Sequence, residues 1–478
     1  MAFLVGGANS AADTGYDIDN SLRFNYADVA FLANTTGSAG SDRIFTFSYW
    51  TKRSTIADSD GQGNNYVLNC STGSFNDNNF MGMQLMSTDL SRLSTWYSDT
   101  DIRTAGVLRD PSAWYHIVLS VDTTQATDTN RVKIYVNGSI ASLSQADYPD
   151  QNHDYDAVGT SGADFIIGAA NNGSAYYDHL HGYLADFYFI DGTAYAASDF
   201  GETDEDSGIW KPKKASVTYG TNGFFLEFKE TGTNQDSSGI GADTSGNDNH
   251  FAVTNLAATD QTTDTPTNNF CTLNPLWSGA GGTLSEGNTK VVVGSSEYGP
   301  VLGTIAMTSG KWYWEVLCTT FNYWRTGIAD VTLPLTTSWN LGYESSPDNA
   351  VYRDGGYVGK NGSNILSGQP SLAVDETVSV AFDADSGKIW FAQDGAWINS
   401  GDPAAGSNEA TSVTAGESYY PALSDGNDET SSTYSFNFGN PPHSISSSQA
   451  DDNGYGNFEF DVPAGFYALC TKNLAEYG

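Results

Sequence analysis

The chain has 478 residues, which is enough for two or more hydrophobic cores. Its formal net charge of −37 argues against nucleic-acid binding, because a polyanion of this size is repelled by phosphate backbones. No apolar run approaches the roughly 18 residues that a membrane-spanning helix needs, so we expect no membrane insertion.

The composition predicts β structure. Aromatic residues make up 13% of the chain and glycine occurs 51 times, a combination that favours pleated strands joined by tight turns. The four cysteines are far apart and form no CxxC pair, which predicts neither a zinc site nor a disulfide framework. They are Cys70, Cys271, Cys318 and Cys470. We therefore expect the chain to fold where thiols stay reduced.

A first β domain is predicted over residues 21–230, behind a short arm at residues 1–20. Alternation of apolar and polar residues indicates half-buried strands at 44–50, 114–122 and 131–136. More continuously apolar strands follow at 165–168, 184–190 and 223–228. The pair Asn137-Gly138 ends one of these strands as a hairpin turn would.

A second β domain is predicted over residues 271–478. Between the two domains, residues 231–270 are rich in Thr, Asp, Ser, Gly and Asn, which is typical of a polar linker. Strands are predicted at 311–316, 378–382, 389–391, 434–438 and 465–470. The expected fold is thus all-β, with two antiparallel β-sandwich (jelly-roll-like) domains in tandem.

Several motifs resemble known β-sandwich families. The first domain resembles the laminin-G-like, concanavalin-A-type lectin fold, through FTFSYW at 45–50, WYHIV at 114–118, KIYVNG at 133–138 and GYLADFY at 182–188. The second is similar to the SPRY domain, through GKWYWEV at 310–316, RTGIA at 325–329, SVAFD at 379–383, YPAL at 420–423 and FNFG at 436–439.

The order of motifs over the whole chain, including residues 15–24, 200–204 and 210–212, resembles structural proteins of marine bacteriophages. That resemblance implies a place on the virion, other virion proteins as partners, and recognition of glycan or protein, with host cell-surface glycan as one candidate. We also expect a homo-oligomer on the particle. The start of the chain lacks the basic region of a secretion signal and its apolar stretch is too short for one, so we expect assembly in the host cytoplasm.

A glycoside hydrolase is the enzyme alternative, since lectin-type sandwiches also carry glucanases. That chemistry needs two carboxylates about 5–9.5 Å apart. The nearest approach to the E-x-D-x-x-E pattern of such enzymes is residues 202–207, where Ser207 replaces the last Glu, in what we expect to be a solvated loop. The chain has no GxSxG or HExxH motif. We expect a protein that is not an enzyme.

No cofactor is expected, and calcium is the one metal worth considering, because related sandwich domains hold it with carboxylates and carbonyls. The candidate ligands are Asp154, Asp156 and Asp178, and none has EF-hand spacing. With 57 acidic residues, chance clusters are expected.

Aromatic residues divide into core and candidate ligand platforms. Those within strands, such as Trp50, Trp114, Trp312, Trp314 and Trp390, are expected in the core. Those in turn-rich segments, with their polar neighbours, are the ligand-binding candidates. They are Trp96, Tyr97, Asn171, Asn172, Tyr176, Tyr177, Asp178, His179, Trp324, Arg325, Trp339 and Tyr343.

The apolar residues Phe3, Leu4 and Val5 allow two interpretations of residues 1–20. The segment is either a frayed terminus or an arm that docks on another virion protein. Two functions also remain open, namely a tail- or fibre-associated adhesion protein and a capsid decoration or scaffold protein. No coiled-coil shaft is visible that would favour a self-contained fibre.

Overall fold

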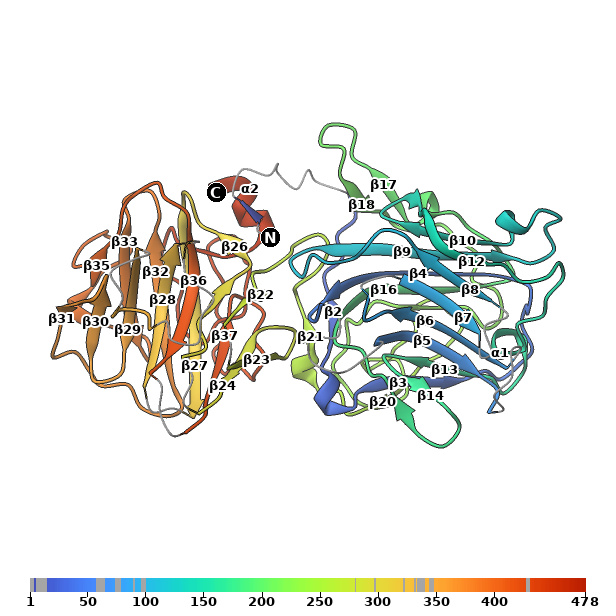
Figure 1. Cartoon of the computed structure of the whole chain (residues 1–478), viewed down its shortest axis with the longest axis horizontal. Coiled ribbons are helices and arrows are strands. Elements are labelled where there is room, and N and C mark those ends of the chain that lie inside the picture. Colours follow the sequence, from blue (N-terminus) through green and yellow to red (C-terminus); the bar gives the residue numbers. More distant parts are fainter. Residues whose placement is uncertain are drawn as a thin grey trace. The chain divides into compact units, whose positions relative to one another are not determined.

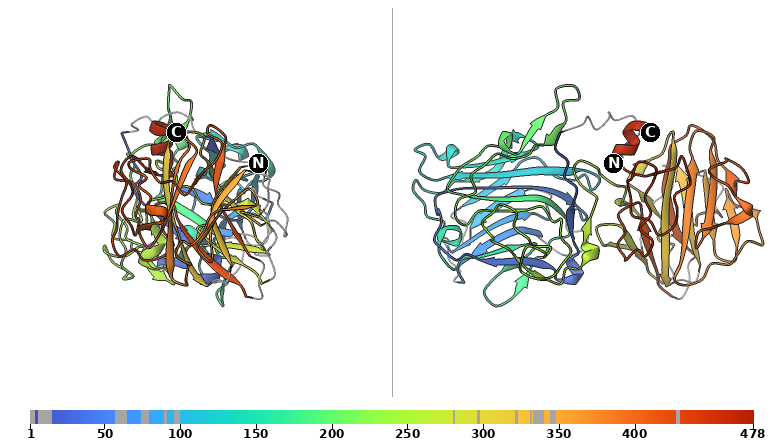
Figure 2. Two further views of the ribbon diagram at one scale, coloured as in Figure 1. Left: turned by 90° about the vertical axis from the view of Figure 1, so that its left-hand side faces the viewer. Right: turned by 180° about the vertical axis from the view of Figure 1, so that it is seen from behind.

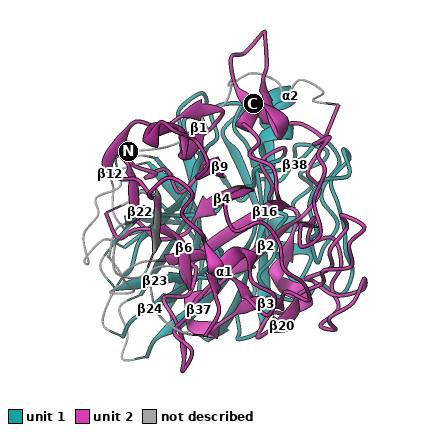
Figure 3. Cartoon of the chain, turned by 90° about the vertical axis from the view of Figure 1, so that its right-hand side faces the viewer, with its two compact units in different colours: residues 1–11, 268–478 teal, residues 12–267 magenta. Residues whose placement is uncertain are grey.

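The protein folds into two compact units, an N-terminal unit of residues 12–267 and a C-terminal unit of residues 1–11 and 268–478 (Figure 3). The computed structural model describes residues 4–5, 15–56, 65–73, 79–88, 91–95, 100–279, 281–295, 298–320, 323–330, 332, 340–343, 348–426 and 430–478. Each unit has two large β-sheets, so the predicted all-β fold with two jelly-roll-like sandwiches is confirmed.

The N-terminal unit stacks two eight-stranded antiparallel sheets (Figure 1). The first sheet has the order β11 (Ser139–Ile140), β10 (Val132–Val136), β9 (Trp114–Asp122), β4 (Ile44–Arg53), β16 (Gly182–Asp191), β2 (Ser21–Phe24) and β21 (Gln261–Thr262), with β19 (Phe224–Leu226) also paired to β16. The second has the order β12 (Leu143–Asp147), β8 (Asp101–Thr104), β7 (Ser91–Thr95), β6 (Phe80–Leu85), β5 (Asn65–Ser71), β13 (Asp164–Ile167), β3 (Phe31–Thr35) and β20 (Ala252–Thr254).

The C-terminal unit stacks a seven-stranded sheet on a nine-stranded sheet; the right-hand view in Figure 2 shows these strands from behind. The first has the order β22 (Leu273–Ser278), β25 (Val301–Gly303), β36 (Tyr419–Asp425), β28 (Trp324–Asp330), β29 (Asn349–Arg353), β30 (Tyr357–Lys360) and β31 (Ser363–Leu366). The second has the order β23 (Gly282–Ser285), β24 (Lys290–Val293), β37 (Ser432–Asn437), β27 (Lys311–Thr320), β32 (Glu376–Asp383), β33 (Lys388–Gln393) and β34 (Ala396–Trp397), with β35 (Thr411–Ser412) on β33 and β38 (Tyr467–Ala468) parallel to β27.

Smaller elements complete the described fold. Two hairpins, β14 (Ala170–Asn171) with β15 (Tyr176–Tyr177) and β17 (Gly201–Thr203) with β18 (Trp210–Pro212), belong to the N-terminal unit, as does helix α1 (Asp156–Gly159). Short 3-10 turns are η1 (Tyr26–Asp28), η2 (Asp128–Asn130), η3 (Ala197–Asp199), η4 (Ala258–Asp260) and η5 (Ile398–Ser400). The C-terminal unit ends in helix α2 (Thr471–Tyr477). Within the described ranges, no helix has the length and apolarity to cross a membrane.

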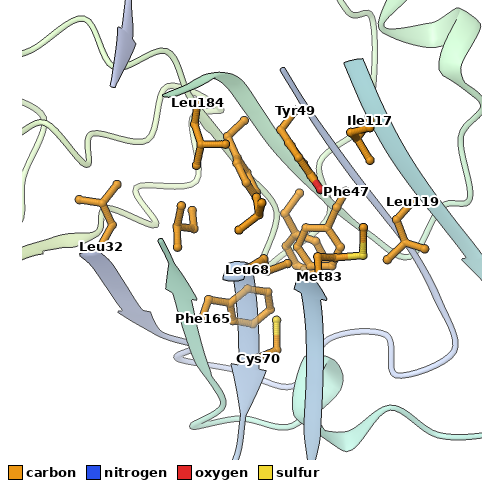
Figure 4. Packing of buried hydrophobic residues seen from close by; sticks show 14 of the residues in the cluster. Leu32, Phe47, Tyr49, Leu68, Cys70, Met83, Ile117, Leu119, Phe165 and Leu184 are labelled. Atoms are coloured by element: carbon orange, nitrogen blue, oxygen red, sulfur yellow. The ribbon is translucent and has the colours of Figure 1, made fainter. Parts of the chain in front are cut away.

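The core of the N-terminal unit lies between its two sheets. Figure 4 shows Phe47 and Tyr49 of β4 beside Ile117 and Leu119 of β9, facing Met83 of the opposite sheet. All five side chains are fully buried, as the alternation along these strands predicted. Each such burial contributes on the order of 1.5–3 kcal/mol, so this interior row is a main source of stability.

The core of the C-terminal unit is built on the strands that the sequence indicated. Trp312 and Trp314 point from β27 into the space between the sheets, where they join Val380 and Phe382 of the adjacent β32. The intervening Tyr313 is also buried, on the other face of the same sheet, in a second apolar cluster. Both faces of this sheet are therefore covered, which explains its nearly continuous apolar sequence.

Residues 231–270 are not the polar linker that their composition predicted. Residues up to 267 belong to the N-terminal unit, where β20 pairs with β3 and β21 pairs with β2. Three apolar residues of this segment are buried in the core of that unit, namely Ile240, Phe251 and Leu256. Asp264 of this segment also forms a buried ion pair with β4, in which the Lys52 ammonium lies 2.8 Å from the carboxylate. A few buried contacts and strand pairings thus fold this segment into the N-terminal unit despite its polar composition.

The interpretation of residues 1–20 as a separate arm is also wrong where the structure describes it. Tyr16 and Ile18 pack against the N-terminal unit, with Ile18 almost fully buried. Leu4 and Val5 form strand β1 (Leu4–Val5), which runs parallel to β26 (Ile305–Ala306) in the C-terminal unit of the same chain. Phe3 lies outside the described residues. The backbone of the proposed docking segment is thus engaged within its own chain.

Candidate functional site

The tyrosine hairpin, defined as residues 170–179 around β14 and β15, brings together six of the predicted ligand-binding residues. Tyr176 is 41% exposed and stacks on Phe31, with ring centroids 4.0 Å apart. Tyr177 is half-buried and meets Tyr66 edge to face at 6.2 Å. Tyr176 is therefore the more exposed of the two tyrosines.

The polar residues of the tyrosine hairpin are mostly used by the hairpin itself. The side-chain oxygens of Asn171 and Asn172 accept hydrogen bonds from the backbone of residues 173–175, closing the turn. His179 is buried between the rings of Tyr26 and Phe31, and this burial lowers its pKa. Burial likewise raises the pKa of Asp178. These groups stabilise the hairpin or are buried in it, so it exposes few polar atoms that could bind a ligand.

The predicted ligand-binding residues of the C-terminal unit do not all lie on one surface. Trp324 is a core residue and not a ligand contact, since it is fully buried between the two sheets on β28. Its neighbour Arg325 points to the opposite, outer face of the seven-stranded sheet, because successive side chains alternate along a strand. Trp96, Tyr97 and Trp339 lie outside the described residues.

Four strands place a row of side chains across this outer face. Arg325 of β28 is directly opposite Arg353 of β29, which in turn is opposite Tyr357 of β30. On the other side, Arg325 is opposite Ser424 of β36. The register of four antiparallel strands thus aligns two guanidinium groups with an aromatic ring and a hydroxyl.

Tyr343 reaches this row because the preceding residues are fixed to the sheet. The Leu341 amide donates to the Ser424 hydroxyl at 3.1 Å, and the Gly342 amide donates to Asn349 Oδ1 at 2.9 Å. Gly342 has a φ of 82°, and a Cβ there would come within 2.8 Å of Val351. Only glycine allows the backbone to approach the strands so closely.

The two tyrosine rings cover the two arginines. The Tyr343 ring centroid lies 4.3 Å from the Arg353 guanidinium carbon and 5.1 Å from that of Arg325. The Tyr357 centroid lies 5.0 Å from the Arg353 guanidinium carbon. Tyr343 is 53% exposed and Tyr357 36%, so both rings also face solvent. We call these four residues the arginine–tyrosine cluster.

Sequence reasoning found half of the arginine–tyrosine cluster. Arg325 and Tyr343 were predicted, whereas Arg353 and Tyr357 were missed. The signal available for the missed pair was the alternation of 349–360, in which Arg353 and Tyr357 flank the turn at 354–356. That pattern shows a hairpin, but only strand order places it beside Arg325.

A shallow hollow of about 380 Å³ at the edge of the first sheet of the N-terminal unit is a further feature of sugar-binding size. Tyr135 and Tyr195 line it together with Asp122 and Gln125. The Asp122 carboxylate already accepts hydrogen bonds from Gln125 and from the turn that follows. The carboxylate that lines the hollow is therefore already engaged within the protein.

The acidic segment suspected of hydrolase chemistry forms a turn at the end of a short strand. Glu202 lies in β17, contrary to the expected loop, and Asp204 accepts hydrogen bonds from the amide and hydroxyl of Ser207. These bonds, with that from Lys211, lower the pKa of Asp204 to about 2. A carboxylate held ionised in this way is unsuited to act as a general acid near neutral pH.

The calcium candidates do not gather into one place. Asp154 forms an ion pair with Arg43, Asp156 begins helix α1, and Asp178 lies in the tyrosine hairpin. Among the residues that the structure describes, no group of three or more His, Cys, Asp or Glu side chains is arranged to hold a metal. The four cysteines are buried and free.

Parts of the chain are similar to several solved structures. The SPRY domain of human HERC1 is 16% identical over 34% of this chain and 96% of that domain, with a TM-score of 0.28. A heptameric SAP-like pentraxin from Limulus polyphemus is 18% identical over 38% of this chain and 80% of that protein, with a TM-score of 0.28. A putative carbohydrate-binding protein from Bacteroides ovatus is 17% identical over 50% of this chain and 58% of its own length, with a TM-score of 0.33.

No family model matches the sequence, and no curated protein matches it. At identities and TM-scores this low, the solved structures carry no argument about ligand or activity. Any function must therefore be argued from the side chains of this chain.

Proposed function

We propose that this protein is a non-enzymatic binding protein that engages a glycan or protein ligand through the arginine–tyrosine cluster. The observation that carries the proposal is the placement of the two rings. Tyr343 and Tyr357 lie over Arg325 and Arg353 and remain partly exposed. Rings that stack on a cation with one face and meet solvent with the other are typical of recognition surfaces.

We further propose that the protein acts on the surface of a bacteriophage particle, as a tail- or fibre-associated adhesion protein with a host-surface ligand. The order of sequence motifs over nearly the whole chain supports this location. A capsid decoration role, with contacts only to other virion proteins, is the alternative. Localising the chain in an electron-microscopy map of the particle distinguishes a host-facing position from one buried among virion proteins.

Two matched variants test which surface binds. Tyr343→Ala removes an exposed ring from the arginine–tyrosine cluster, and Tyr176→Ala removes a comparably exposed ring from the tyrosine hairpin. On an array of bacterial envelope glycans, Tyr343→Ala should weaken binding by about 1–3 kcal/mol while Tyr176→Ala leaves it unchanged. The reverse result would transfer the site to the hairpin. Wild-type protein that binds neither the array nor intact host cells would remove the adhesion proposal.

The absence of catalysis is a separate proposal, supported by the ionised, hydrogen-bonded state of Asp204. Incubation with laminarin, agar, alginate and host envelope polysaccharide should release no reducing ends. Turnover that disappears in Glu202→Ala or Asp204→Ala would instead establish a hydrolase.

A further inference from the structure

The two arginines of the arginine–tyrosine cluster are buried, although guanidinium groups strongly prefer water. Arg325 is 3% exposed and Arg353 is 4% exposed. Arg325 Nη1 donates to the backbone carbonyl of Asp425 at 2.5 Å, and Arg353 Nη2 donates to Asn364 Oδ1. The Nε atoms of both arginines are buried without a hydrogen-bond partner. Each guanidinium therefore has only part of its five-donor capacity satisfied.

None of the ion pairs among the described residues includes Arg325 or Arg353. Asp354 and Asp425 are the acidic groups close enough to act on Arg325, but they do so without a direct contact. Burial raises the pKa of both carboxyl groups, and the charge of Arg325 opposes that shift in each. The chain has 57 acidic residues against 20 Lys and Arg, so potential anionic partners are plentiful elsewhere in the sequence.

This arrangement carries a free-energy cost in the unliganded protein. Like charges that are directly opposite on neighbouring strands repel each other, and burial strengthens that repulsion. An arginine cannot relieve the repulsion by losing its proton, because it stays charged in proteins. An anion that supplies further acceptors would lower this cost.

The aromatic rings restrict what that anion is attached to. A guanidinium fork matches planar carboxylates and tetrahedral sulfates with two parallel hydrogen bonds. Tyr343 and Tyr357 would then flank the anion with flat, partly apolar surfaces. A pyranose ring has an apolar face that packs on such rings, so a sugar bearing the anionic group uses both halves of the cluster.

We propose that Arg325 and Arg353 form an anion subsite, and that the ligand is an acidic glycan whose carboxylate or sulfate binds between the two guanidinium groups while its sugar ring packs on Tyr343 or Tyr357. This inference rests on the proposed function and specifies its ligand class. The ligand would accept hydrogen bonds from guanidinium donors other than Arg325 Nη1 and Arg353 Nη2, which already have partners.

Titration calorimetry on the full chain tests the subsite with defined probes. The probes are a galacturonate trimer and a 6-sulfated galactose, with maltotriose as the neutral comparator. The titrations are run at about 0.5 M salt, where repulsion from the net charge is largely screened. We expect the acidic probes to bind at least tenfold more tightly than maltotriose, and inorganic sulfate to compete with them.

Arg353→Gln should weaken binding of the acidic probes at least tenfold. The matched control is Lys290→Gln, which removes the same charge from β24, on the other sheet of this unit. It should bind the probes like the wild type. If Arg353→Gln does not fold, Tyr357→Ala provides the second variant, since it keeps both arginines and should still favour acidic over neutral probes.

Acidic probes that bind no better than maltotriose would overturn the anion subsite, as would equal losses in Arg353→Gln and Lys290→Gln. If wild-type protein still binds the glycan array through Tyr343 in that case, the proposed function stands and only the ligand class is wrong. A protein ligand bound at the cluster, with no affinity for either acidic probe, also overturns this inference.

Discussion

Lys52 and Asp264 in the N-terminal unit and Arg325 and Arg353 in the C-terminal unit are all buried charges, but among the described residues only the first two form an ion pair. The Lys52 ammonium lies 2.8 Å from the Asp264 carboxylate, which also accepts a hydrogen bond from Trp114. Neither arginine takes part in an ion pair among the described residues. A matched buried pair ties two segments of a chain together, whereas unmatched like charges are retained at a cost.

Asp186 shows how a buried acid escapes that cost. It is 5% exposed on β16 and accepts a hydrogen bond from the Tyr16 hydroxyl at 2.7 Å. Burial raises its pKa to about 7, so the group can bind a proton and become neutral. Arginine has no such option. The comparison therefore suggests that unmatched arginines mark a site for an external anion, whereas unmatched acids need no ligand.

The largest effect is expected from breaking the matched pair. Lys52→Met leaves the Asp264 carboxylate buried without its cation, which should lower the free energy of unfolding by about 3–5 kcal/mol. Urea denaturation followed by tryptophan fluorescence measures this change. Lys229→Met is the control, because it breaks an exposed pair with Glu227 and should cost less than about 1 kcal/mol. If both variants lose the same free energy of unfolding, burial does not increase the contribution of the Lys52–Asp264 pair to stability.

The next effect is the pH dependence contributed by Asp186. Because its folded-state pKa is raised, its contribution to stability is fully present below the unfolded-state pKa of about 4 and is lost as pH rises through about 7. Asp186→Asn should remove this dependence, and the stability difference between the two proteins should change by on the order of 3 kcal/mol between pH 4 and pH 8. Thermal midpoints measured at both pH values provide the check. If the stability difference between wild type and Asp186→Asn is the same at both pH values, Asp186 is ionised in the folded state.

Removing one of the two buried arginines should change the free energy of unfolding only slightly, and toward higher stability. Arg353→Met keeps much of the apolar packing and relieves repulsion with Arg325, so the free energy of unfolding should stay equal or rise by about 0–2 kcal/mol. Chemical denaturation measures it against the wild type. A loss above about 2 kcal/mol would show that Arg353 is a structural residue, as Lys52 is expected to be.

The smallest effect should come from the exposed ring. Tyr343→Ala removes a partly solvated contact with Arg353, which is worth less than about 1 kcal/mol, so the thermal midpoint should hardly move. Trp314→Ala is the contrasting core variant and should cost about 3–5 kcal/mol. A large stability loss in Tyr343→Ala would identify its ring as a structural cover.

The sequence by itself determined the fold class and the strands that build both cores. Alternation along residues 44–50 and 114–122 predicted which side chains face inward, because the period of a strand is set by local backbone geometry. The prediction from composition failed for residues 231–270, which it identified as a linker. There, three buried apolar residues and the Lys52–Asp264 ion pair outweigh the polar majority.

The candidate site was decided by the tertiary structure. Local sequence placed Arg325 and Trp324 together, but strand alternation buries Trp324 in the core and turns Arg325 to the outer face. Arg353 joins Arg325 through the register of β28 and β29, which pairs these two residues although they are 28 positions apart, and the hairpin of β29 and β30 adds Tyr357. Such pairing depends on the packing of whole sheets, so no local pattern in one sequence reveals it.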